Sequence, residues 1–405
     1  MNPSASGWIP KFLTLVEIQQ IAIKFSDEHI FYHQLKTTGF LFGISLEALP
    51  IKPISKLNIT TDEYTKINLF HSLLFTFFIK NPKADLNEAI VSIIEFYKDL
   101  EKGKTSFLHK ISISKTPSDI LEHVLASRLH ETNKISKKKE AAIVPYSLLY
   151  LDVLTYRKYL SSKESIILYE QELESNIINF CFLALKAKKD KDTFDHQIID
   201  QIDASTAYLT FKDNQNQFLT IEKLILESDY DLLEKKFILD LCCLAVWNDR
   251  ELDTTEFQFL KNLVQTLQIS EEKIQTNLDF IKLFSEKHSK SLTLFENTNP
   301  LNHLYKHATA TVKLLIIRNK NRLIKELEES GELVKLLGQS AVRELSTEEK
   351  DKVKEQLLDI CKTVPSLTIF LIPGGSLLLP LLVKYIPSLL PSAFNENRID
   401  SNKKN

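Results

Sequence analysis

The sequence VPSLTIFLIPGGSLLLPLLVKYIPSLLPSAF, at residues 364–394, is the most apolar stretch of the chain. No ionisable side chain occurs from Thr363 to Val383, and Lys384 is the first charge to interrupt the run. An uncharged apolar run of about 20 residues is long enough to cross a bilayer as a helix. The sequence therefore predicts a membrane segment at residues 363–394, with the lipid bilayer as its partner.

Proline and glycine interrupt this predicted segment. Pro-Gly-Gly at residues 373–375 divides the run, and Pro380 and Pro387 follow at seven-residue intervals. Membranes tolerate such breaks where neighbouring segments or a cavity satisfy the freed backbone groups. We therefore expect a kinked span or a helical hairpin that dips into one leaflet, with Lys384 reaching the interface. The alternative is a soluble helical hairpin that forms the core of the last domain.

The rest of the chain has the composition of a soluble helical protein. Its 405 residues are enough for about two or three domains. Glycine is scarce, at eight residues, while Leu, Ile, Lys and Glu are abundant, which favours helices. The net charge of −2 does not indicate a nucleic-acid binder, so no DNA partner is expected. We predict an all-α fold: a multi-helical soluble body with a C-terminal, proline-broken hydrophobic helical segment in the membrane.

Local start signals predict several helices. Thr60-Thr-Asp-Glu63 and Ser346-Thr-Glu-Glu349 are capping boxes, in which a hydroxyl and a carboxylate satisfy amide donors at the helix start. Thr116-Pro117-Ser118-Asp119 is a third start signal, with proline at the first helical position. The apolar run Ile67–Ile79 follows the first box and is only about 13 residues long, too short for a span. A buried core helix is the expected outcome there.

An acidic turn at residues 248–253 joins two predicted helices. Asp249, Glu251 and Asp253 alternate as the first three ligands of a calcium loop do, which makes them a candidate metal site. The sixth and twelfth positions, Thr254 and Leu260, do not fit an EF-hand. The alternative is that Asp253 caps the second helix. Five apolar residues are expected on the inner side of that helix: Phe257, Leu260, Leu263, Val264 and Leu267.

Recognisable catalytic motifs are absent from the sequence, so no enzyme activity and no cofactor is predicted. His123 and His130, on one predicted helix with Glu122 and Arg128, are expected to be interface or capping groups. The N-terminus lacks the basic start and apolar core of a signal peptide, which predicts a cytoplasmic body. The cysteines are expected to be buried reduced thiols; they are Cys181, Cys242, Cys243 and Cys361.

The string ILDLCCLAVWNDRELDTTEFQFLKNLVQTLQIS, at residues 238–270, resembles the central helix pair of TerB-like (tellurite-resistance-type) domains. That pattern joins an apolar helix to an acidic turn and then to a helix that opens with acid, Phe and Leu. The resemblance implies a metal- or stress-responsive module that uses the acidic turn.

The terminal stretch LIPGGSLLLPLLVKYIPSLLPSAF resembles the membrane segment of the LETM1 family of inner-membrane proteins, which has bacterial relatives. The matching features are apolar-Pro, Leu-Leu-Pro, apolar-Lys-apolar-apolar-Pro and a closing Leu-Pro-Ser-Ala-Phe. The residues that carry the segment are Ile372, Pro373, Gly374, Gly375, Ser376, Pro380, Lys384, Pro387, Pro391 and Phe394. Together with the TerB-like middle, the chain resembles LETM1-related biofilm-associated proteins.

The resemblance implies cation/proton transport or ribosome binding, with two departures. Ser376 stands where the family places a glutamate in the membrane segment. In addition, the family's ribosome-binding region extends well beyond the Pro-Ser-Ala-Phe step, and only residues 395–405 follow it here. The leading hypothesis is therefore a non-enzymatic, membrane-associated protein in envelope or biofilm organisation, on the cytoplasmic side of the inner membrane. Self-association round Ser376 and Lys384 would favour transport.

Composition shifts and linkers predict four regions. These are an N-terminal helical domain (1–190), a TerB-like domain (191–290), a basic helical connector (291–345) and a LETM1-like segment (346–405).

Overall fold

A computed structural model describes residues 7–15, 27–49, 59–103, 116–134, 148–163, 165–189, 220–226, 229–247, 252–288 and 329–340, with residues 3, 191, 343, 346, 348–349, 352–353 and 355–356. These residues form helices and turns, and no β-strand occurs among them. The predicted all-α fold is confirmed for this part of the chain.

The chain divides into two compact units. Unit 1 combines residues 1–174 with 230–307, and unit 2 combines 175–229 with 308–405. The domain limits predicted at residues 190, 290 and 345 remain predictions.

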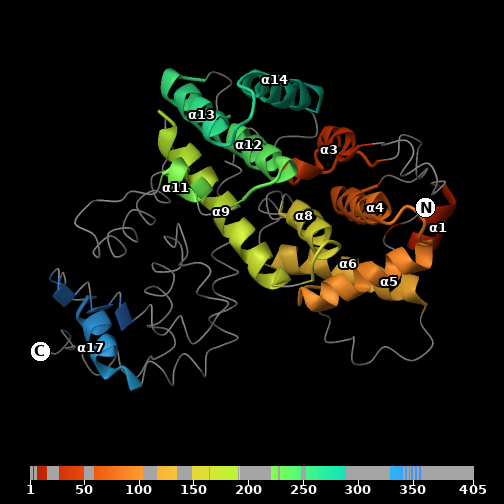
Figure 1. Cartoon of the computed structure of the whole chain (residues 1–405), viewed down its shortest axis with the longest axis horizontal. Coiled ribbons are helices and arrows are strands. Elements are labelled where there is room, and N and C mark those ends of the chain that lie inside the picture. The colour runs from red at the N-terminus through yellow and green to blue at the C-terminus, as the bar shows by residue number, and fades with distance from the viewer. Residues whose placement is uncertain are drawn as a thin grey trace, which may run out of the picture. The chain divides into compact units, whose positions relative to one another are not determined.

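Figure 1 labels the helices of the described residues. Unit 1 holds α1 (Trp8–Leu15), α3 (Glu28–Thr37), the 3-10 helix η1 (Phe40–Phe42), α4 (Thr61–Lys80), α5 (Leu86–Asp99), α6 (Pro117–Lys134), α8 (Leu149–Tyr159), α12 (Leu232–Val246), α13 (Thr254–Thr266) and α14 (Glu272–Lys287). Helix α9 (Ile166–Ala187) begins in unit 1, and α11 (Ile221–Leu226) and α17 (Gly331–Ser340) belong to unit 2.

Helix α4 is the centre of the first core. Its capping box is present as expected, since the Glu63 amide donates to Thr60 Oγ1 and the Thr60 amide to the Glu63 carboxylate. The helix is buried along most of its length and packs on α8, α5, α6 and α3 (Figure 1). The prediction that Ile67–Ile79 forms a buried core helix, with no span there, is confirmed.

The polar side chains inside α4 bind the preceding loop. Asn68 Oδ1 accepts from the Leu49 amide at 3.1 Å, and its Nδ2 donates to the Glu47 carbonyl at 2.9 Å. His71 Nδ1 lies 2.8 Å from the Leu49 carbonyl, so that nitrogen carries the hydrogen. These bonds satisfy buried polar groups and fix the loop on the helix.

Gly39 allows the tight turn that leads into that loop. Its φ is +83°, in the left-handed region that glycine occupies readily. A Cβ there would lie 2.0 Å from the Ile44 carbonyl oxygen. The turn therefore requires glycine both for its backbone angle and for space.

Helices α12, α13 and α14 pack on one another as a second group within unit 1 (Figure 1). Helix α12 is buried along most of its length and ends at Val246, with Trp247 as its C-cap. The prediction that Phe257 lies on the inner side of α13 is wrong, because this side chain is 39% exposed while Leu260, Leu263 and Val264 are buried. Phe257 lies in the first turn, at the edge of the buried stripe.

Candidate functional site

The described start of the C-terminal region is a capped helix. The Ser346 amide donates to Glu349 Oε2 at 2.8 Å, and the Glu349 amide is 3.3 Å from Ser346 Oγ. The capping box predicted from Ser-Thr-Glu-Glu is therefore present. Arg343 donates two hydrogen bonds to the same carboxylate, of 2.8 and 2.6 Å. These bonds and the one from the Ser346 amide lower the pKa of Glu349 to about 2, so the carboxylate is ionised at neutral pH.

Polar contacts also join the helical segment that begins at Ser346 to α17. Glu332 accepts from Lys352 Nζ at 3.0 Å and from Gln356 Nε2 at 3.3 Å. At the other end of α17, Gln339 accepts from Arg343 at 2.9 Å. Early residues of one segment thus meet late residues of the other, which is the pairing of an antiparallel helical hairpin. Its described apolar residues are buried: Leu333, Leu336 and Val353.

The residues predicted to carry the membrane segment, from Ile372 to Phe394, lie outside the described residues. Among the described helices, none combines the length and the apolar composition that crossing a bilayer requires. The membrane segment at 363–394 and its alternatives therefore stay predictions.

The acidic turn is described only at its end. Asp249 and Glu251 lie outside the described residues, whereas Asp253 is the N-cap of α13. Asp253 Oδ1 accepts from the Thr255 amide at 2.7 Å and from the Glu256 amide at 2.9 Å, and the Glu256 carboxylate accepts from the Asp253 amide. The capping interpretation of Asp253 is confirmed. Within the described ranges no group of three His, Cys, Asp or Glu residues could hold a metal ion.

Two of the polar residues singled out on α6, Glu122 and Arg128, are interface and capping groups, whereas the side chain of His123 is exposed. Glu122 accepts from the Gly7 amide at 2.9 Å and from the Ile9 amide at 2.8 Å, so it caps the start of α1 from a distant helix. Arg128 donates to Asp152 Oδ2 at 2.8 Å and to its Oδ1 at 3.0 Å. The side chain of His130 lies outside the described residues, so its role stays a prediction.

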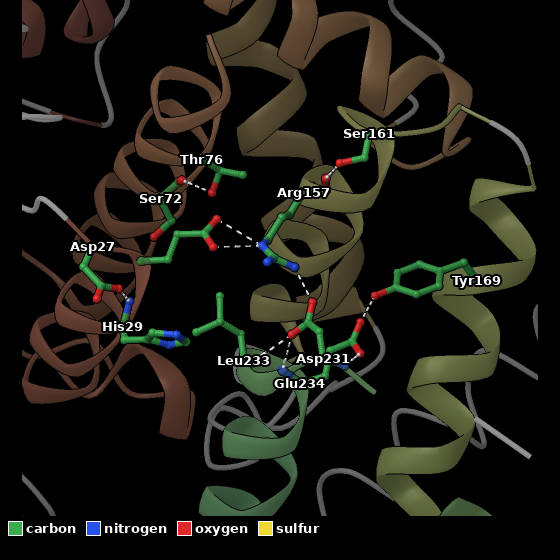
Figure 2. A network of polar contacts seen from close by, with 11 residues as sticks. Asp27, His29, Ser72, Thr76, Arg157, Ser161, Tyr169, Asp231, Leu233 and Glu234 are labelled. Atoms are coloured by element: carbon green, nitrogen blue, oxygen red, sulfur yellow. Dashed lines mark hydrogen bonds and ion pairs between the residues drawn. The ribbon is translucent and has the colours of Figure 1, made fainter. Parts of the chain in front are cut away.

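Sequence reasoning missed a polar junction in unit 1, drawn in Figure 2. Arg157, on α8, donates from Nε to both oxygens of Glu28, at 3.0 and 3.2 Å, and from Nη1 to Asp231. Asp231 and Glu234 form the capping box of α12, and Glu234 also accepts from the hydroxyl of Tyr169 on α9. The junction therefore connects α3, α8, α9 and α12.

The junction has the chemistry of a structural link. Every carboxylate in it already accepts from a guanidinium, an amide or a phenol. Burial raises the pKa of Tyr169, and the neighbouring Glu234 carboxylate adds to the rise, so the phenol stays a donor. Burial also raises the pKa of Glu234, with a further rise from Asp231. The Asp231-x-x-Glu234 capping signal was visible in the sequence, but Glu28 and Arg157 carry no local signal.

A second buried link was also missed. Lys36 Nζ, on α3, donates to Asp240 Oδ1 on α12 at 2.7 Å and to Asn277 on α14 at 2.8 Å. The Tyr32 hydroxyl donates to the other Asp240 oxygen at 2.6 Å. Both members of the ion pair are buried. The cysteines that the structure describes are buried thiols outside any disulfide, as predicted; they are Cys181, Cys242 and Cys243.

Comparison with known proteins concerns the C-terminal region. Residues 345–405 match the protein-family model described as LETM1-like, RBD, and residues 1–344 lie outside that match. No curated protein and no solved structure matches the chain. The TerB-like and biofilm resemblances therefore stay predictions. The C-terminal region that begins with the capped helix at Ser346 is similar to the LETM1-like, RBD family, and the LETM1 resemblance is confirmed for that part of the chain.

Proposed function

We propose that the chain is a non-enzymatic, membrane-associated helical protein. Residues 363–394 would hold a cytoplasmic helical body at the inner membrane, where it acts in the organisation of the cell envelope. The observation that carries the proposal is the position of the uncharged apolar run inside the region that matches the LETM1-like family. A charged helix precedes the run and a second charged stretch follows it, as an apolar anchor with polar flanks requires.

The described hairpin supports this arrangement. The Arg343–Glu349 and Lys352–Glu332 pairs are exposed, so the surface just before the apolar run is polar and suited to water. A charged side chain at the centre of a membrane helix costs about 3 kcal/mol on insertion scales, and none occurs between Thr363 and Val383. A polar lead-in suited to water followed by an uncharged run suited to a bilayer is the pattern that the proposal requires.

Membrane fractionation with an alkaline carbonate wash tests the proposal. The full chain is compared with a chain that ends at Thr363 and with a full-length Leu378→Asp/Leu382→Asp variant. Lys384→Gln is the matched control, because it changes a charge near the end of the run without adding one to its centre. We expect the full chain and the control in the washed pellet and the other two in the supernatant. A soluble full chain would refute the anchor and favour a packed soluble hairpin.

A second candidate function is ribosome association at the membrane. The family description carries the term RBD, and its match covers residues 345–405. Co-sedimentation of detergent-solubilised chain with purified ribosomes tests this candidate, with a chain that ends at Glu344 as the control. Binding by the full chain alone would support it. Equal sedimentation of both chains would mean that residues 345–405 do not bind ribosomes.

A further inference from the structure

Two adjacent residues attach the start of α9 to the rest of unit 1. The Tyr169 hydroxyl donates to Glu234 on α12, and Glu170 pairs with Lys102 just after the end of α5. Ile166 and Leu173 of the same turns are buried, so apolar packing and these side-chain polar links together position the start of α9.

Glu170 faces charged groups from several elements. Lys102 reaches it from the α5 end, Asp152 acts on it from α8, and Glu174 lies one turn further along α9. Asp152 is itself bound by Arg128 from α6 and accepts from the Tyr97 hydroxyl on α5 at 3.0 Å. Three carboxylates are thus gathered where α5, α6, α8 and α9 approach one another, and all three are buried.

The cation on Glu170 compensates its charge only in part. Lys102 Nζ is the cation that contacts the Glu170 carboxylate directly. The Lys102 side chain is 24% exposed, whereas that of Glu170 is 3% exposed. Water therefore screens the lysine more than the carboxylate, and a buried carboxylate with incomplete compensation favours its neutral form.

We propose that docking of the first turns of α9 on the rest of unit 1 is linked to proton binding at Glu170, so that acidification tightens the docking and rising pH weakens it. Burial raises the pKa of Glu170 to about 7; Lys102 opposes the rise, while Glu174 and Asp152 add to it. If α9 detaches, Glu170 enters water, where its pKa returns to the ordinary value near 4.5.

The direction of the pH dependence of docking follows from proton linkage. Between about pH 4.5 and pH 7 the docked form holds more protons than the detached form, so raising the pH through this window favours detachment. Taking pKa values of about 7 and 4.5, the opening constant of this helix end rises about 30-fold from pH 5.5 to pH 8. Glu234, whose pKa burial also raises, acts in the same direction.

Hydrogen exchange of the full chain, measured by mass spectrometry at both pH values and corrected for intrinsic exchange, tests the proposal. The peptide spanning Tyr169–Glu174 is compared in the parent, in Glu170→Gln and in Glu172→Gln, a matched control on the opposite side of α9. We expect the 30-fold increase in the parent and the control, and an increase several-fold smaller in Glu170→Gln. An unchanged increase in Glu170→Gln would overturn the proposal.

A direct titration keeps the proposal testable if that variant folds poorly. The carboxyl carbon of Glu170, observed by NMR in protein with carbon-13-labelled glutamate, should titrate near pH 7, and Lys102→Met should move its midpoint to higher pH. A midpoint below pH 5, or a downward shift in the Lys102→Met variant, would refute the assignment.

Discussion

Truncation of Asp240 should destabilise unit 1 more than truncation of any exposed charge. Asp240→Ala removes the acceptor of Lys36 and of the Tyr32 hydroxyl, and both donors are buried. The pair joins α3 to α12 across 204 residues of sequence. Its loss therefore tests whether residues 230–288 form part of the same folded unit as the N-terminal helices.

The expected magnitude follows from burial. Removal of one member of a buried ion pair typically costs about 3–5 kcal/mol, because the other charge stays inside without its partner. Lys36 keeps its bond to Asn277 and lies 4.7 Å from the centre of the Phe280 ring, which places the cost near the lower end of that range. The free energy of unfolding of an ordinary domain is about 5–15 kcal/mol, so this loss is a large fraction of the total stability.

Lys287→Ala is the matched control. Lys287 pairs with Glu47 at 3.1 Å across a similar sequence distance, but the two side chains are 62% and 54% exposed. An exposed pair of this kind contributes about 0–1 kcal/mol. The two pairs differ chiefly in burial, which is the quantity under test.

Urea unfolding followed by tryptophan fluorescence is the appropriate assay. Both tryptophans of the chain, Trp8 and Trp247, lie in unit 1, so the signal reports on that unit. A loss for Asp240→Ala no larger than that for Lys287→Ala would refute the burial argument. Replacing Lys36, Asp240 and Tyr32 together by Met, Leu and Phe should recover most of the stability, because no buried charge remains.

Three further expectations are simpler. Gly39→Ala should destabilise unit 1 by about 1–3 kcal/mol or more in the same assay, because a left-handed backbone is strained for alanine and the new Cβ meets the Ile44 carbonyl. Asp253→Ala should lower the free energy of unfolding by about 1 kcal/mol, since two amides at the start of α13 lose their acceptor. Asp253→Asn should retain most of the cap's stabilisation, because asparagine is also a good N-cap. The described buried thiols should react with an aromatic disulfide reagent only after unfolding, since burial raises the pKa of Cys243 well above its ordinary value.

Local chemistry made the helix starts predictable. Thr60, Asp253 and Ser346 each precede a glutamate by three residues, and each forms the expected capping box or its two bonds. A cap involves only a few consecutive residues, so the sequence contains the whole interaction.

Long-range polar links were not predictable in the same way. Arg157 reaches Glu28 across 129 residues and Asp231 across 74, and Lys36 reaches Asp240 across 204. Each of these side chains is an ordinary charged residue of a helix when its own neighbourhood is read alone. Their partners are set by how the helices pack, and one sequence holds no record of that packing. The prediction for Phe257 was wrong for a related reason: helical periodicity predicts which side of a helix is buried but not where the buried stripe ends.

The described part of unit 1 contains buried as well as exposed ion pairs, whereas the hairpin of unit 2 has exposed ones. The buried pairs of unit 1 are Lys36–Asp240 and Arg128–Asp152. Each joins two helices, so its geometry depends on how those helices pack. In unit 2 the pairs of the hairpin are exposed, and exposed pairs add little stability. Burial of Leu333, Leu336 and Val353 therefore contributes more to the described part of the hairpin than its exposed ion pairs do. If residues 363–394 formed part of a soluble core with these three, a chain ending at Thr363 would lose this hairpin as well. If those residues enter the bilayer, the hairpin should persist without them, so protection of residues 331–340 in the truncated chain distinguishes an anchor from a core.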